Sequence, residues 1–142
     1  MKRINTGKVL LGGLAATFVL LICGIGYILV AGDEGRAALE AINTRERSPA
    51  IMAGYLAIML MTGIFSVWLY AAIRPRFGRG PRTALIAAFV VWVLRPGLAI
   101  ANFLLLGLMP TGILLTELFW NLGAICLATL AGARIYSEDE TP

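Results

Sequence analysis

The sequence of 142 residues contains no histidine, and this absence excludes several classes of site. Histidine supplies both axial ligands of bis-histidine haems and is the commonest protein ligand of zinc and copper. A catalytic Ser-His-Asp or Cys-His set also needs an imidazole. We therefore predict no metal site and no cofactor held by residues of this chain.

Charged residues are scarce, at 14% of the chain, whereas soluble proteins contain about 25%. The sequence has no Gly-x-x-x-x-Gly-Lys-Ser/Thr or Gly-x-Gly-x-x-Gly pattern that would cradle a phosphate. An acid/base pair inside the apolar segments would need Glu117 and an arginine, and arginine stays protonated at any working pH. We predict that the protein is not an enzyme.

There are only two cysteines, Cys23 and Cys126, and both fall inside apolar segments. No Cys-x-x-Cys motif is present. Both thiols are expected to act as small apolar packing residues. A redox pair that exchanges disulfides or reacts with a quinone is the alternative interpretation.

Hydrophobic residues make up 59% of the chain, and the mean hydropathy is +0.84. Four apolar runs reach the roughly 20 residues that cross a bilayer as a helix; they cover residues 9–31, 50–73, 83–108 and 111–135. The first run is too long for the core of a signal peptide, about 7–15 residues, and is read as an uncleaved span. We predict an all-α integral membrane protein, an up-down bundle of four transmembrane helices in a single domain, 1–142.

The basic residues predict the orientation of this bundle. Lys2, Arg3 and Lys8 precede the first run, and four arginines fill the short connection after the second, namely Arg74, Arg76, Arg79 and Arg82. By the positive-inside rule, both termini and this connection lie in the cytoplasm, with a bacterial inner membrane as the expected location. The four arginines are predicted to contact anionic lipid or a partner protein, and not nucleic acid, because no aromatic residues are interleaved for base stacking.

The connection between the first two runs, residues 33–48, mixes charges of both signs with apolar residues at helical spacing. It predicts an amphipathic outer segment that lies on the membrane or docks a partner. Ser48 is expected to cap the next helix, and Pro49 to be its first residue.

Two ionisable residues lie well inside the apolar runs, and they form the main candidate site. Arg95 is about halfway along the third run, and Glu117 is in the fourth. Counting from a turn near Met109, their axial offset is roughly 9–10 Å, so an ion pair requires a bend. Pro96, followed by Gly97, provides one, because proline cannot donate its backbone hydrogen bond.

Helical spacing places further polar and small residues around this pair. Arg95 and Asn102 are seven residues apart and share one stripe. Glu117 and Asn121 share another, which is continued by Ala124, Ala128 and Gly132. Small residues at four-residue spacing let helices approach closely, so the second stripe is predicted to face the third span or another subunit.

Two segments resemble a loose set of small, uncharacterised bacterial proteins with four spans. They are VWLYAAIRPRFGRGPRTALIA, Val67 to Ala87, and LATLAGARIY, Leu127 to Tyr136. In that set an arginine and proline turn joins spans two and three, and a small-residue run ends span four. The resemblance implies fold and topology only, because the set has no assigned activity and the Arg95-Pro96-Gly97 element and Glu117 are not matched in it.

One interpretation is that Arg95, Asn102, Glu117 and Asn121 serve only as hydrogen-bonding contacts between helices. At the level of the whole protein, two functions are compatible with these features. The first is a non-enzymatic accessory or scaffold subunit, which packs against other integral membrane proteins or copies of itself. The second is a small oligomeric transporter or channel, in which Arg95 binds an anionic group and Glu117 couples to protons at the membrane midplane. Membrane lipids are expected partners in either case.

Overall fold

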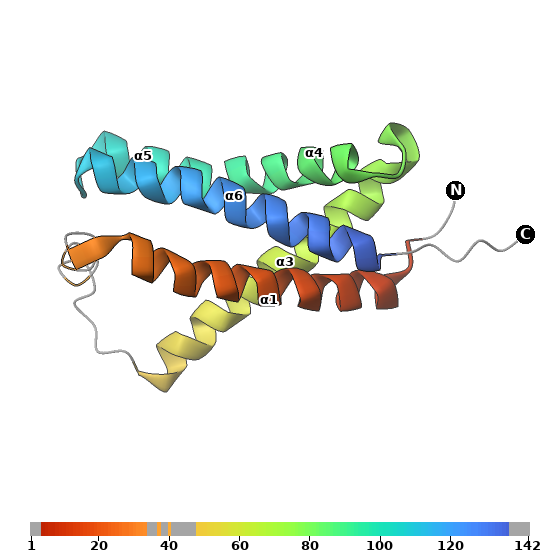
Figure 1. Cartoon of the computed structure of the whole chain (residues 1–142), viewed down its shortest axis with the longest axis horizontal. Helices are drawn as coiled ribbons and strands as arrows, with labels where there is room; N and C mark the ends of the chain where they lie inside the picture. Colours follow the sequence, from red (N-terminus) through yellow and green to blue (C-terminus); the bar gives the residue numbers. More distant parts are fainter. Residues whose placement is uncertain (1–3, 34–36, 38–39, 41–47, 137–142) are drawn as a thin grey trace, which may run out of the picture.

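A computed structural model describes residues 4–33, 37, 40 and 48–136 of the chain. Over these residues the protein is an up-down bundle of long apolar helices (Figure 1). The spans are α1 (Thr6–Val30), α3 (Pro49–Phe77), a third that joins α4 (Pro81–Trp92), the π-helix η1 (Val93–Gly97) and α5 (Leu98–Leu106), and α6 (Thr111–Ile135). The predicted class, an all-α bundle of four membrane-spanning helices, is confirmed.

The helix ends follow from local chemistry. The Ser48 hydroxyl accepts a hydrogen bond from the Ile51 amide at 3.4 Å, and Pro49 is the first residue of α3, both as predicted. The helix continues past the predicted end at residue 73, because Gly78 and not Pro75 ends it. The remainder of the predicted outer segment, 33–48, lies largely outside the described residues.

A tight turn joins α3 to α4. Gly78 and Gly80 adopt φ values of +83° and +141°, which side chains with a Cβ rarely tolerate. The buried Thr83 hydroxyl donates a hydrogen bond to the Gly78 carbonyl at 2.8 Å and thereby ties the first turn of α4 to the end of α3. The turn lies within the short connection predicted between the runs 50–73 and 83–108.

Two of the helices, α1 and α3, have their buried residues in only one half of the bundle. The buried residues of α1 lie in its first half, between Val9 and Leu20, whereas those of α3 lie in its second half, between Thr62 and Arg74. Because the helices alternate in direction, both sets are at the end where α1 begins and α6 ends. In the other half, the start of α3 diverges from the remaining helices (Figure 1).

Glycines make the close approach in the packed half possible. A Cβ built on Gly12 would lie 2.7 Å from the Gly132 carbonyl oxygen, and one on Gly63 would lie 2.6 Å from the Gly13 carbonyl oxygen. Real Cβ atoms essentially never come this close, so a larger residue at these positions would push backbone away from backbone. These contacts join α1 to α6 and α1 to α3.

The small-residue stripe of α6 is buried; Ala124 lines a cavity together with residues of the third span, as predicted, whereas Gly132 packs against α1 and α3. Ala124, Ala128 and Gly132 are all buried. At Gly132 the nearest neighbours are Gly12 and Ala16 of α1 and Val67 of α3. The small residues of α1 allow α6 to approach it closely there.

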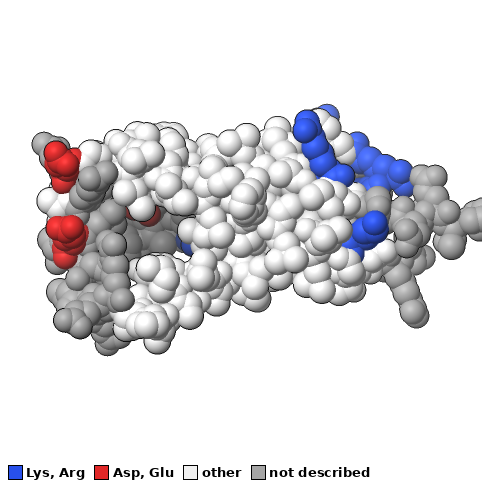
Figure 2. Space-filling model, turned by 60° about the horizontal axis from the view of Figure 1, so that its bottom comes forward, with Lys and Arg blue, Asp and Glu red and all other residues white. Residues whose placement is uncertain are grey.

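Apart from Arg95 and Glu117, the charged residues that the structure describes lie at the two ends of the bundle. Figure 2 shows Lys and Arg at one end, Asp and Glu at the other, and a broad uncharged surface between them. Arg76, Arg79 and Arg82 are exposed at the basic end. Arg74 is not available to lipid as predicted, because it is only 7% exposed and its guanidinium carbon lies 5.5 Å from the centre of the Tyr136 ring. The four candidate spans indicate an integral membrane protein, whereas its orientation stays a prediction.

Candidate functional site

The Arg95-Pro96-Gly97 element forms a widened helical turn and not a break. Residues Val93–Gly97 adopt a π-helix, in which the Leu98 amide donates to the Val93 carbonyl five residues back. This geometry accommodates Pro96, which has no amide hydrogen and is buried inside the helix. The third span therefore runs through without dividing into two half-helices. Single π-turns occur frequently at functional sites in proteins.

A cavity of about 400 Å³ lies beside this turn, in the loosely packed half of the bundle. Ligand sites in proteins typically enclose about 300–1,000 Å³, so its size is sufficient for a small molecule or a lipid head group. Every span contributes to its wall, which includes Leu20, Gly24, Tyr27, Tyr55, Met59, Arg95, Pro96, Phe103, Glu117, Trp120, Asn121 and Ala124. Figure 2 shows a hollow in the uncharged surface, with basic and acidic atoms visible inside it.

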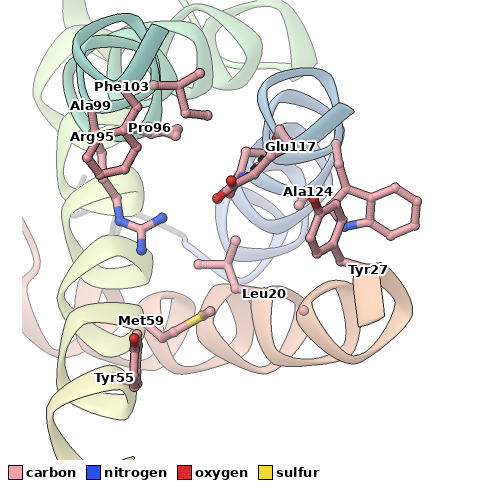
Figure 3. Close-up of a pocket in the computed structure, with 14 residues that line it drawn as sticks. Leu20, Tyr27, Tyr55, Met59, Arg95, Pro96, Ala99, Phe103, Glu117 and Ala124 are labelled. Atoms are coloured by element: carbon pink, nitrogen blue, oxygen red, sulfur yellow. Dashed lines mark hydrogen bonds between the residues drawn. The ribbon is translucent and has the colours of Figure 1, made fainter. Parts of the chain in front are cut away.

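Arg95 and Glu117 face each other across this cavity (Figure 3). Both side chains are partly buried. Neither forms a hydrogen bond or an ion pair with any residue in the part of the chain that the structure describes, although the two opposite charges are within electrostatic reach of each other. The structure thus brings together the two predicted residues without the direct ion pair.

Other polar groups, and not these two charges, hold the helices together around the cavity. The Trp92 indole nitrogen donates to the Leu118 carbonyl at 2.9 Å and links the third span to α6. The Trp120 indole nitrogen donates to the Cys23 carbonyl at 3.0 Å and links α6 to α1. These two tryptophans thus supply hydrogen bonds between helices near the cavity.

The two asparagines of the predicted polar cluster are placed differently. Asn121 lines the cavity with Glu117, and its amide donates to the Glu117 backbone carbonyl at 2.9 Å. Asn102 is exposed and does not line the cavity, in contrast to the stripe predicted from its spacing to Arg95. A π-turn holds one residue more than an α-turn, so the side chains after it are rotated by about 100°, which turns Asn102 away.

Arg95 also lines a second hollow, an apolar groove of about 560 Å³ between α3 and the third span. Apart from Thr62 and Arg95, its lining is hydrophobic and includes Ile58, Met61, Phe65, Val90 and Leu94. Met61 and Leu94 are 60% and 63% exposed, so the groove lies on the surface that faces the bilayer. Arg95 therefore lines both the polar cavity and the apolar groove.

Sequence reasoning did not assign the aromatic residues of the cavity to the site. Tyr27, Tyr55 and Trp120 line its wall, and the rings of Tyr27 and Trp120 are 6.0 Å apart, centre to centre. A signal was present, since both tyrosines are polar aromatics inside apolar runs. Their spacing within single helices did not reveal that three different helices converge there.

No protein-family model, no curated protein and no solved structure matches this chain.

Proposed function

We propose that this protein is a non-enzymatic membrane transporter, which binds the charged group of its substrate in the cavity between Arg95 and Glu117. The observation that carries this proposal is that two opposite charges face one cavity without pairing to protein groups that the structure describes. Sequence reasoning ranked an accessory subunit first, and the cavity favours the transporter.

The energetic argument compares structural and ligand-binding roles. A charged side chain at the centre of a membrane helix costs roughly 2.5–3.5 kcal/mol on insertion scales. If Arg95 and Glu117 served only to join helices, hydrogen bonds across the interface would offset this cost, as those of Trp92 and Trp120 do for their indoles. A ligand or water in the cavity supplies the missing partners.

The shape of the bundle suits transport because the cavity is closed on one side. The glycine contacts of the packed half, such as Gly63 against Gly13, lie between the cavity and the basic end. Release toward that end requires these helices to separate while the open half closes. This corresponds to alternating access around a central site.

An accessory subunit is the second candidate, and the first half of α3 favours it. From Met52 to Ile58 every residue is exposed, because this part of the helix diverges from the others. A membrane partner that packs along it would bury apolar residues such as Met52, Leu56 and Ile58. Lipid contact alone also satisfies this surface, so the cavity is the more specific observation.

The experiment that separates the two candidates is native mass spectrometry of the tagged protein, extracted from its own membranes in a mild detergent. We expect a bound small molecule or lipid that is retained by the wild type and lost at least tenfold in Arg95→Gln and Glu117→Gln. Arg134→Gln is the matched control, because Arg134 is exposed at the end of α6 and outside the cavity. A stoichiometric membrane-protein partner without a bound molecule would instead support the accessory subunit.

A further inference from the structure

The polar cavity and the apolar groove share one lining residue, Arg95, and together they suit an amphipathic ligand. Arg95 lines both hollows. On one side of it lies the cavity with Glu117 and Asn121, and on the other lies the groove with Met61 and Phe65. A ligand that contacts both carries charge at one end and hydrocarbon at the other.

We propose that the two hollows together bind one membrane lipid with a zwitterionic head group that contains a phosphate and an amine. The phosphate lies against the Arg95 guanidinium, which matches phosphate oxygens with two parallel donors. The amine lies toward the Glu117 carboxylate, and one acyl chain occupies the groove between α3 and the third span. This inference rests on the proposed function and names the class of its substrate.

The groove argues for a lipid over a water-soluble zwitterion. It faces the bilayer, since Met61, Phe65 and Leu94 are all more than half exposed, and a hydrocarbon chain gains contacts with it that a soluble zwitterion does not. A soluble zwitterion would use the cavity and leave the groove without a role. A soluble substrate does not explain why Arg95 lines the groove as well as the charged cavity.

The depth of Arg95 distinguishes this site from the ordinary shell of lipid around a membrane protein. Arg95 lies near the middle of the third span, which extends from Pro81 to Leu106. A head group that reaches it has left the membrane surface and entered the bundle, while the chain remains in contact with hydrocarbon. Binding therefore represents part of a movement of the head group across the membrane.

The test measures retention of dioleoyl phosphatidylethanolamine by the full-length protein, using native mass spectrometry from mixed micelles of defined composition. We expect at least tenfold weaker retention in Arg95→Gln and in Glu117→Gln, which remove the head-group contacts. Ala57→Trp, which fills the groove, should weaken retention to a similar degree without touching either charge. Leu105→Trp is its matched control, because Leu105 is 87% exposed and lies outside both hollows.

Three outcomes would overturn the inference. Equal retention by all four variants and the wild type would mean that only surrounding lipid is detected. Glycerophosphoethanolamine has the same head group without acyl chains. If it binds tightly and Ala57→Trp does not change retention, the substrate is soluble and the proposed transport function still holds. If phosphatidylglycerol is retained as strongly as phosphatidylethanolamine and Glu117→Gln does not weaken retention, the site does not require an amine.

Failure of the proposed function gives a different result. In that case neither phosphatidylethanolamine nor glycerophosphoethanolamine would depend on Arg95 or Glu117. Because Ala57 is exposed on α3, Ala57→Trp reports on the groove even if a charge variant fails to fold. Size-exclusion chromatography of each variant in the same detergent checks that the fold is retained.

Discussion

The crossing of α1 and α3 allows a sharp test of the packing, through the substitution Gly63→Ala. A Cβ at this position would lie 2.6 Å from the Gly13 carbonyl oxygen and 2.8 Å from the Thr17 backbone nitrogen. The Thr17 hydroxyl oxygen is closer still, but these two neighbours are backbone atoms, so rotation of the Thr17 side chain alone does not relieve the contact. The two helices must move apart by several tenths of an ångström, and the contacts around Val67 loosen with them.

The magnitude follows from a comparison with Gly54→Ala on the same helix. A Cβ on Gly54 meets no atom within 4 Å, so this control gains the helix propensity of alanine, about 0.8–1.0 kcal/mol, without a clash. Gly63→Ala gains the same propensity but also overpacks the interface, at a cost of about 1–3 kcal/mol. The difference between the variants isolates the packing cost and corresponds to a factor of about 5 to more than 100 in the unfolding equilibrium.

The assay is reversible unfolding in mixed micelles with increasing sodium dodecyl sulfate, followed by tryptophan fluorescence. Gly63→Ala should unfold at a lower fraction of dodecyl sulfate than the wild type, or than Gly54→Ala at the least. The double variant Gly13→Ala with Gly63→Ala should lose less than the sum of the single losses, because both substitutions open the same interface. Identical midpoints for Gly63→Ala and Gly54→Ala would refute the reasoning that this crossing depends on glycine.

Two further predictions concern a hydrogen bond and the orientation. Trp120→Phe removes the donor to the Cys23 carbonyl, so we expect the free energy of unfolding to fall by about 0.6–2 kcal/mol in the same assay. Trp68→Phe, at an exposed position, should change it little. Equal losses in the two variants would show that the hydrogen bond does not join α6 to α1. For orientation, a thiol reagent that does not cross the membrane should label Asp33→Cys in intact cells and Arg79→Cys only after permeabilisation, and the reverse pattern would contradict the cytoplasmic placement of the basic end.

Much of the fold was accessible from the sequence because membrane helices obey simple rules. Apolar runs of sufficient length predict spans, since the bilayer leaves helices few alternatives, and glycines and prolines near residue 80 predict the turn between α3 and α4. The cap at Ser48 follows from the chemistry of one hydroxyl. These features depend on neighbours in the chain and are readable from local pattern.

The candidate site was only partly accessible, because it depends on how helices are placed relative to one another. Their spacing grouped Glu117 with Asn121, and both line the cavity. Arg95 and Asn102 were grouped in the same way, but the π-turn at Pro96 rotates the residues after it, so the two no longer share a helix face. A sequence read with uniform helical periodicity contains no sign of an extra residue in one turn. The burial of Arg74 beneath Tyr136 likewise arises from packing between α3 and the end of α6.

The division of the bundle into a tight half and an open half means that depth in the membrane separates two kinds of sequence constraint. Near the basic end, residues such as Gly63 and Gly132 are limited by backbone contact, so only the smallest side chains fit there. Toward the other end, changes of size in the walls of the cavity and the groove leave the fold intact and alter ligand binding instead. In a library of variants, substitutions in the half near the basic end should therefore reduce the amount of folded protein. Substitutions in the other half should change ligand selectivity.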